Sequence, residues 1–505
     1  MLKDAQGLEV TTDSPEAIAS INRFIEQALS YGKDAFTAIY QGIAADPSCG
    51  MLHAYAAAHF LSMENAQAAK QAVPHLQASQ QNLAKTTQRE QLYVQAIAAW
   101  AKGEIKEAIA LHEAIAEKFP RDLISVQQGQ YHYFYLGDKE RLLKIAQKVL
   151  PVNRENHYLY GMVAFGLEQC HRLKQAEAMG RMATAMNRHD PWAHHAVAHV
   201  METQGRVDEG IAWMENLADT WENCNSMLYT HNWWHLALYY LEQGDKNQVL
   251  TLYDTRVWGR AHKESPKDQV GAIALLLRLE LHGVDVGDRW RELSVYLFPR
   301  LHEHALPFQD LHYVYALARA GYTDWVNEMR LSMHKHALKV NPYLRRNWLE
   351  VAIPAARGMV AYANGEYLKA IAQLKPVLPR LHLVGGSHAQ RDLFQQLYLD
   401  ALLQNEQQSW VYRGKAEGRG QREVRAEVSS DLIFGGAEGN RRNEISIITS
   451  VLPSASLLEA EPPGMHYHTE HGNEGTREKR ISFDKSRWLE TGFIQETRFL
   501  ITPHN

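Results

Sequence analysis

The segment Gly103–Pro120, GEIKEAIALHEAIAEKFP, carries the pattern that decides the fold. It opens with a glycine, continues with alanine, isoleucine and leucine at helical spacing, and ends in a proline. Glycine accepts the left-handed conformation that ends many helices, and apolar residues three and four positions apart form one helical face. The segment therefore predicts a turn at Gly103 followed by an amphipathic helix that ends before Pro120.

Glycine turns of the same kind recur along the chain, and their spacing indicates a repeat array. Gly103 and Gly137 lie 34 residues apart, and Gly205 follows Gly137 after 68 residues, which is twice that distance. His171 occupies the slot halfway between Gly137 and Gly205 without a glycine. Less regularly spaced turns are predicted at Gly244, Gly321 and Gly365.

A 34-residue period with a glycine between two helices resembles the tetratricopeptide repeat. Small residues such as Ala96, Ala108, Ala198 and Gly358 would let paired helices approach closely. One helix pair cannot bury its own apolar face, so such repeats stack into a superhelix with a concave inner surface. We therefore expect an all-α, tetratricopeptide-repeat-like superhelical solenoid of helix pairs, with a C-terminal tail of little regular structure. The alternative is an irregular helical domain.

Three regions of the chain differ in pattern. Residues 1–85 predict helices of less regular spacing, beginning with Ser14 as N-cap and Pro15 at the first helical position. Residues 86–405 hold the repeat array. Residues 406–505 are polar and interrupted by glycine and proline, so we expect a disordered or loosely attached tail, or an extension without native function. Within this tail, residues 444–452 could form a short strand.

The composition is that of an ordinary soluble protein. The chain is 45% hydrophobic and 22% charged with a net charge of -5, which gives no basic excess for nucleic acid. Its three cysteines, Cys49, Cys170 and Cys224, have no spacing typical of a metal site or a disulfide framework. No signal peptide and no membrane-spanning apolar run is recognised. We expect a cytoplasmic protein with no nucleic-acid and no membrane partner; the sequence leaves its oligomeric state open.

Histidine is enriched, with 26 residues against 53 lysines and arginines, and two histidine pairs lie on predicted helices. His195 and His199 form the first pair, and His231 and His235 the second, 36 residues later. Four-residue spacing puts each pair on one helical face, and adjacent first helices of a superhelix are about 8–10 Å apart. The four imidazoles can therefore converge. His194 falls on the core-facing stripe and is expected to be structural.

Glu202 lies on the same helical face as His195 and His199. Two histidines at i and i+4 can share a metal, and a carboxylate or water can complete the shell. We expect one of three roles for the four histidines: a site for a divalent metal (Zn, Fe or Mn), ligand binding in the groove, or ordinary structural packing. The metal-site candidates are His195, His199, His231 and His235.

A second polar stretch, GGSHAQRDLF, begins at Gly385. Ser387 and Gln390 have the spacing of a capping box, so a helix is predicted to begin here. Free N–H groups at a helix N-terminus suit an anion. The further ligand-binding candidates are His388, Arg391 and Asp392. The alternative is a well-capped helix with a surface ion pair.

Two functions fit these residues. The favoured hypothesis is a helical repeat protein whose His-rich concave groove binds a protein or a small polar or anionic ligand. The alternative is a metal-dependent hydrolase-type enzyme using the four histidines, with Glu202 or Asp310 as base. His312, two residues after Asp310, is a third catalytic candidate. The enzyme requires the four histidines in one closed pocket, whereas the binding protein requires an open groove.

Four stretches together resemble the tetratricopeptide repeat protein 38 family. They are DPWAHHAVAHVMETQGRVDEGIAWM, HNWWHLALYYLEQGD, GGSHAQRDLF and, near the start, DAQGLEVTTDSPEA. The resemblance covers roughly residues 4–405 and implies a helical repeat protein. It fixes no catalytic residue. The tail after about residue 405 departs from the family pattern.

Overall fold

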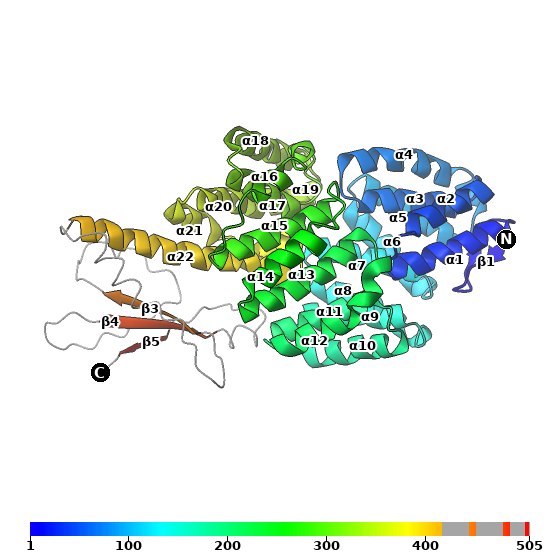
Figure 1. Ribbon diagram of the computed structural model, residues 1–505. Coiled ribbons are helices and arrows are strands. Elements are labelled where there is room, and N and C mark those ends of the chain that lie inside the picture. Colours follow the sequence, from blue (N-terminus) through cyan, green and yellow to red (C-terminus); the bar gives the residue numbers. More distant parts are fainter. Residues whose placement is uncertain (417–443, 451–477, 485–499, 504–505) are drawn as a thin grey trace. The chain divides into compact units, whose positions relative to one another are not determined.

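The computed structural model describes residues 1–416, 444–450, 478–484 and 500–503, with side chains up to residue 408. The chain divides into two compact units, Met1–Ala401 and Leu402–Asn505. The first unit is helical except for a short antiparallel hairpin of β1 (Leu2–Lys3) and β2 (Glu9–Val10) (Figure 1). The predicted disorder of residues 406–505 falls mostly outside the described residues.

The first half of the helical array runs from α1 to α11. Their bounds are α1 Pro15–Leu29, α2 Ala35–Ala45, α3 Gly50–Ser62, α4 Ala66–Gln80, α5 Gln88–Ala101, α6 Ile105–Lys118, α7 Leu123–Leu136, α8 Lys139–Val149, α9 His157–Gln169, α10 Leu173–Met186 and α11 Pro191–Thr203. None of the helices in the described part of the chain combines the length and the apolar composition needed to cross a membrane.

The second half runs from α12 to α22. Their bounds are α12 Val207–Leu217, α13 Ser226–Gln243, α14 Lys246–Leu252, α15 Pro266–Leu281, α16 Arg289–Ser294, α17 Pro307–Arg319, α18 Thr323–Lys339, α19 Pro342–Asn347, α20 Ile353–Ala363, α21 Tyr367–Leu374 and α22 His388–Ala416. A short 3₁₀ segment, η7 (Leu378–Val384), precedes α22.

Local sequence explains where the helices begin and end. Ser14 and Asp190 each accept a backbone N–H three residues later, at the starts of α1 and α11, and proline follows each cap as predicted. The six predicted turn glycines, Gly103, Gly137, Gly205, Gly244, Gly321 and Gly365, all have positive φ. His171, in the slot predicted to lack its glycine, also has positive φ, at 56°. The predicted period is confirmed.

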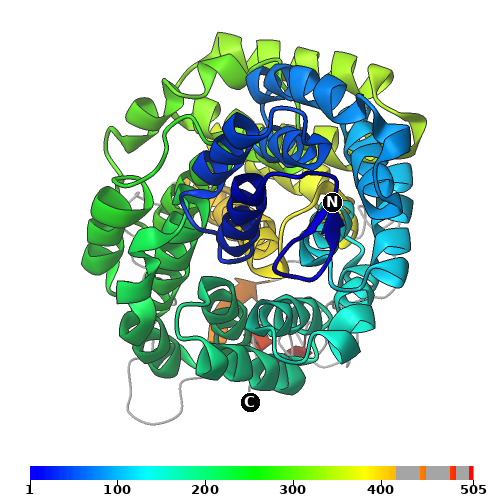
Figure 2. The ribbon, with the colours of Figure 1, turned by 90° about the vertical axis from the view of Figure 1, so that its right-hand side faces the viewer.

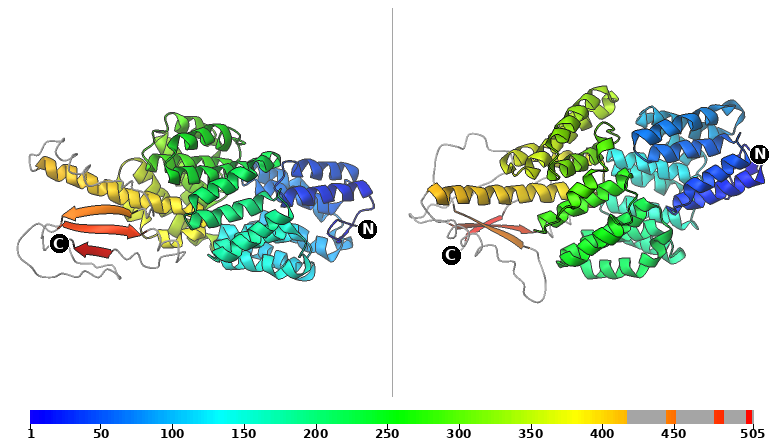
Figure 3. Two further views of the ribbon diagram at one scale, coloured as in Figure 1. Left: turned by 60° about the horizontal axis from the view of Figure 1, so that its bottom comes forward. Right: turned by 45° about the horizontal axis from the view of Figure 1, so that its top comes forward.

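Helices pack as consecutive pairs, and the pairs stack. Helix α5 packs on α6, α7 on α8, α9 on α10, α11 on α12 and α13 on α14. The first helices of successive pairs also touch, α9 with α11, α11 with α13, and α13 with α15. This is the predicted solenoid of helix pairs, seen from two further sides in Figure 3. It makes α11 and α13, which carry the two histidine pairs, direct neighbours.

The apolar core consists of two large clusters that meet at α11. One cluster runs from Val10 to Val200 and the other from Val197 to Ala401. Helix α11 contributes Ala196 to the first cluster and Ala198 to the second. Because it is covered on several sides, its three histidines are buried as well.

The first unit winds around a centre, so that early helices meet late ones (Figure 2). Lys267 Nζ lies 3.2 Å from Glu64 Oε1. The Ala66 N–H, at the start of α4, donates to Glu303 at 3.2 Å. Gly137, after α7, lies against His382 of η7. These contacts join residues far apart in sequence and close the superhelix upon itself.

In the second unit, the described strands form one antiparallel sheet. They are β3 Glu444–Ser450, β4 Glu478–Asp484 and β5 Leu500–Pro503, in the order β3-β4-β5. Glu444 pairs with Asp484, and Lys479 pairs with Pro503. Strand β3 lies within the stretch 444–452 where a strand was considered from sequence.

Replacing Gly137 by alanine should destabilise the protein more than the same change at Gly103. Both glycines have positive φ, 69° and 73°, so each alanine costs about 1 kcal/mol of backbone strain. A Cβ at Gly137 would lie 2.2 Å from the carbonyl oxygen of His382, whereas a Cβ at Gly103 meets nothing within 4 Å. We expect the free energy of unfolding in urea to fall by about 1 kcal/mol for Gly103→Ala and by more than about 3 kcal/mol for Gly137→Ala. Equal losses would contradict the contact between the α7 turn and η7.

Candidate metal centre and its cavity

The structure brings the four candidate histidines together between α11 and α13. One ring nitrogen from each of His195, His199, His231 and His235 lies within 4.8 Å of the others. The Nε2 atoms of His195 and His199 are 3.0 Å apart. We refer to these residues as the four-histidine cluster.

Burial keeps the cluster neutral. His195, His199 and His235 are buried, and His231 is partly exposed. Burial, reinforced by the neighbouring imidazoles, lowers the pKa of His195, His199 and His231 well below the ordinary value. Burial lowers the pKa of His235 to about 3. Neutral imidazole is the form that binds metals, and His235 Nε2 has no hydrogen-bond partner among the described residues.

Two glutamate carboxylates lie next to histidines of the cluster. Glu202 Oε2 is 3.0 Å from His235 Nδ1, and Glu168 Oε1, on α9, is 3.7 Å from His199 Nδ1. Glu168 also pairs with His388 at the start of α22. A hydrogen bond such as that between Glu202 and His235 fixes the tautomer and ring orientation of a metal-binding histidine, whereas Glu168 acts on His199 through its charge.

The two carboxylates differ in charge state. Burial raises the pKa of Glu202 to about 7, although Arg278 and His388 act in the opposite direction. Burial also disfavours the charged form of Glu168, but His388 and His199 outweigh it and lower its pKa to about 2. Glu168 is therefore a fixed negative charge beside the cluster, whereas Glu202 titrates near neutral pH.

The N-terminus of α22 has the predicted capping box. Ser387 Oγ accepts the Gln390 N–H at 3.2 Å, and Gln390 Oε1 accepts the Ser387 N–H at 2.9 Å. Arg391 donates to the Gly386 carbonyl, and Asp392 accepts from a glutamine side chain one turn later. Of the ligand-binding candidates of this helix, His388 pairs with Glu168 beside the four-histidine cluster. Arg391 also interacts with the charge of Glu168, and Asp392 with that of Arg278.

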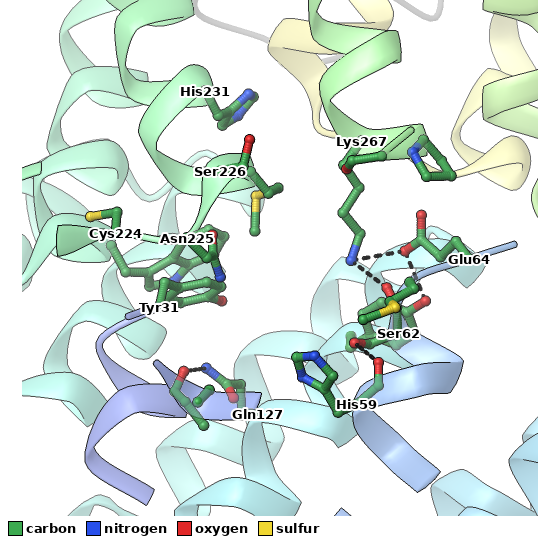
Figure 4. A pocket seen from close by; sticks show the side chains of 18 of the residues that line it. Tyr31, His59, Ser62, Glu64, Gln127, Cys224, Asn225, Ser226, His231 and Lys267 are labelled. Atoms are coloured by element: carbon green, nitrogen blue, oxygen red, sulfur yellow. Dashed lines mark hydrogen bonds and ion pairs between the residues drawn. The ribbon is translucent and has the colours of Figure 1, made fainter. Parts of the chain in front are cut away.

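A cavity of about 930 Å³ adjoins the cluster, and His195 and His231 line it. Figure 4 shows His231 on one wall, with Lys267, Glu64 and His59 at other points of the lining. Small-molecule sites are typically about 300–1,000 Å³. The space at the centre of the superhelix therefore suits a small ligand that can reach the partly exposed His231.

Asp310 and His312, two further candidates, are both buried on α17. Asp310 Oδ2 lies 2.6 Å from His304 Nδ1, and His312 Nδ1 donates to the Phe308 carbonyl at 2.8 Å. These contacts direct both side chains to partners outside the four-histidine cluster. His194 is buried in the core, where it accepts a hydrogen bond from a tryptophan.

Sequence reasoning missed Glu168. A lone glutamate within the apolar stretch of α9 matches no motif. The repeat period could have found it, because Glu168 lies 34 residues before Glu202 and therefore occupies the same place in the preceding repeat.

No protein-family model matches the chain. Among solved structures, the chain is similar to human IFIT1 in a dimer with m7Gppp-AAAA, at 14% identity and a TM-score of 0.39 over 85% of this chain and 97% of that one. It is similar to Rap protein complexed with competence and sporulation factor, at 14% identity and a TM-score of 0.37 over 71% and 100%. The chain is an all-helical protein whose consecutive helix pairs stack as a repeat array. The P58(IPK) TPR domain is also similar, at 11% identity and a TM-score of 0.21 over 64% and 99%. These similarities concern fold alone.

Glu168 should make stability depend on acid pH. Its pKa is about 2 in the folded protein against an ordinary 4.5, so its contribution is present above about pH 4.5 and is lost as the pH falls towards 2. We expect the free energy of unfolding of the wild type to fall more steeply over this window than that of Glu168→Gln. Glu113→Gln, which alters a more exposed ion pair with Lys148, serves as the control and should keep the wild-type slope. Identical slopes for wild type and Glu168→Gln would contradict the assignment.

Proposed function

We propose that the protein binds a divalent transition metal through the four-histidine cluster and receives a small polar ligand in the adjoining cavity. The observation that carries the proposal is the convergence of the four ring nitrogens within 4.8 Å. In a tetrahedral zinc site the ligand nitrogens lie about 3.3 Å apart. The His195–His199 pair is already at 3.0 Å, so ligation requires modest shifts of the other two rings.

The donor chemistry favours zinc or iron over manganese. All four donors are imidazole nitrogens, which suit Zn and Fe, whereas Mn prefers oxygen ligands. Four imidazoles would complete a tetrahedral zinc shell. An iron of higher coordination number would keep positions for a ligand that enters past His231. The cavity supports a small polar ligand over a protein segment, because the superhelix closes around it.

A metal-dependent hydrolase is the second candidate. The pKa of Glu202, raised to about 7 by burial, is suited to a base at neutral pH. Its contact with His235 Nδ1 favours an orienting role instead, since a carboxylate in this position holds a metal ligand. Asp310, the other base considered from sequence, is held by His304. The closed arrangement of the four histidines is the one that the enzyme hypothesis requires, but histidines engage both candidate bases, so metal binding with ligand capture is better supported than hydrolysis at this centre.

The family, the cellular location and the domain bounds are proposed from the sequence. The quoted stretches support membership of the tetratricopeptide repeat protein 38 family, and the composition supports a cytoplasmic location without nucleic-acid partners. We also propose that residues 86–405 form the repeat array proper, preceded by residues 1–85 and followed by a tail, 406–505.

Metal content provides the direct test. Protein purified without an affinity tag should contain about one equivalent of zinc or iron by inductively coupled plasma mass spectrometry. His195→Ala/His235→Ala should lose it with unchanged helicity by circular dichroism. His189→Ala/His334→Ala, which removes two exposed histidines, should retain it. Wild-type protein that stays metal-free after reconstitution with Zn²⁺ and Fe²⁺ would overturn the proposal.

Glu202→Gln should weaken metal binding by about 10–100-fold, because the carboxylate that orients His235 is lost. The measurement is a competition titration of Zn²⁺ against a chelator at pH 7.5. Glu215→Gln, an exposed change on the neighbouring α12, should leave the affinity unchanged. Equal affinities for Glu202→Gln and wild type would exclude the orienting role.

A further inference from the structure

Away from the four-histidine cluster, His304 lies between a carboxylate and a hydroxyl. Asp310 Oδ2 is 2.6 Å from His304 Nδ1, and His304 Nε2 is 2.7 Å from Ser332 Oγ. Asp310 belongs to α17, Ser332 belongs to α18, and His304 lies in the loop before α17. A histidine that activates a serine nucleophile has the same arrangement: a carboxylate accepts from its Nδ1, and the serine hydroxyl faces its Nε2.

We propose that Ser332, His304 and Asp310 form a catalytic triad that hydrolyses small carboxylic esters. This activity is separate from the proposed metal centre, because the two sites share no residue. Ser332 is also absent from the residues that line the described 930 Å³ cavity. Its substrates therefore approach Ser332 from outside this cavity.

The burial of the three side chains fits their roles. Asp310 and His304 are buried, at 1% and 3% exposure, whereas Ser332 is only partly buried and can be reached by a small molecule. Asp310 accepts the Nδ1–H of His304, which leaves the Nε2 lone pair for the Ser332 hydroxyl. The carboxylate thus holds the imidazole in the tautomer and orientation that general-base catalysis needs.

The backbone conformation of His304, which Tyr31, Glu64, Asn82 and His171 also adopt elsewhere in the described chain, helps to place its ring. Its φ is 50°, in the left-handed region that residues other than glycine rarely adopt. Such conformations persist where the surroundings enforce them, and they are concentrated at active sites and ligand clamps. Here the left-handed turn lets one ring reach both Asp310 on α17 and Ser332 on α18.

Two further histidines lie beside Ser332 and His304. Ser332 itself is within helix α18. His302 Nδ1 lies 2.9 Å from Ser332 Oγ, and its Nε2 lies 2.9 Å from Glu328. His336 follows Ser332 by one helical turn, and its ring centroid is 5.2 Å from that of His304. His302 thus connects Ser332 to the Glu328 carboxylate, on the side of Ser332 Oγ that His304 does not occupy.

The reaction consumes ester and water alone. Ser332 Oγ bonds to the acyl carbon, and its proton passes to His304 Nε2. The bond between the acyl carbon and the alcohol oxygen then breaks, and that oxygen takes the proton from His304. Water attacks the acyl-serine and gives a proton to His304. Ser332 regains this proton as the carboxylic acid leaves.

The test uses the full chain with a fluorophosphonate probe and p-nitrophenyl acetate. We expect the probe to label Ser332, located by peptide mass spectrometry, and Ser332→Ala to abolish both labelling and ester hydrolysis. His304→Ala and the isosteric Asp310→Asn should lower the labelling rate by at least about 100-fold. Ser30→Ala is the matched control and should keep both, because Ser30 is a partly buried serine at the end of α1 whose hydroxyl donates to a backbone carbonyl and which does not line the cavity.

Melting temperatures measured on all variants separate loss of chemistry from loss of fold. The activity should survive a chelator and the His195→Ala/His235→Ala change, so that failure of the metal proposal leaves this one intact. Absence of labelling at Ser332 in folded wild type would overturn it. So would an unchanged labelling rate in folded His304→Ala, because Ser332 would then react without its base.

Discussion

The packing of α11 between two apolar clusters is the constraint on which the site depends. Ala196 faces one cluster and Ala198 the other, so little of this helix contacts water. His195 and His199 are nevertheless placed on it, and burial without partners is costly for polar groups. The neighbouring helix α13 meets them with two more imidazoles, and α9 supplies Glu168. Helices from three successive repeats thus place a buried polar cluster within the apolar core.

Closure of the superhelix adds contacts between distant repeats, which an open array of stacked repeats does not make. His388 lies 220 residues after Glu168 in sequence, yet the two side chains pair. The same closure turns a concave face into a cavity that His195 and His231 line. The cavity therefore depends on contacts between distant parts of the array as well as on the helices that carry the histidines.

Features that recur with the repeat period or follow from local backbone chemistry could be predicted from the sequence. Contacts between distant repeats could not. The slot at His171, the caps at Ser14 and Asp190, and the capping box at Ser387 follow from local backbone chemistry, and all are present. The convergence of the histidine pairs follows from a spacing of about one repeat. The Glu168–His388 pair could not be predicted, because it depends on small rotations summed over many repeats. The His304–Ser332 contact was missed because a loop positions it.

Contact between the α7 turn and η7 changes how the array can come apart. An open solenoid behaves as a one-dimensional chain of repeats, whose terminal units can separate while the middle persists. Here Gly137 lies against His382, and Lys267 pairs with Glu64. Unfolding of the repeats at either end therefore also removes contacts from the distant repeats that they touch in the closed superhelix. The unit should consequently unfold as one cooperative body, without the fraying from its ends that a linear array permits.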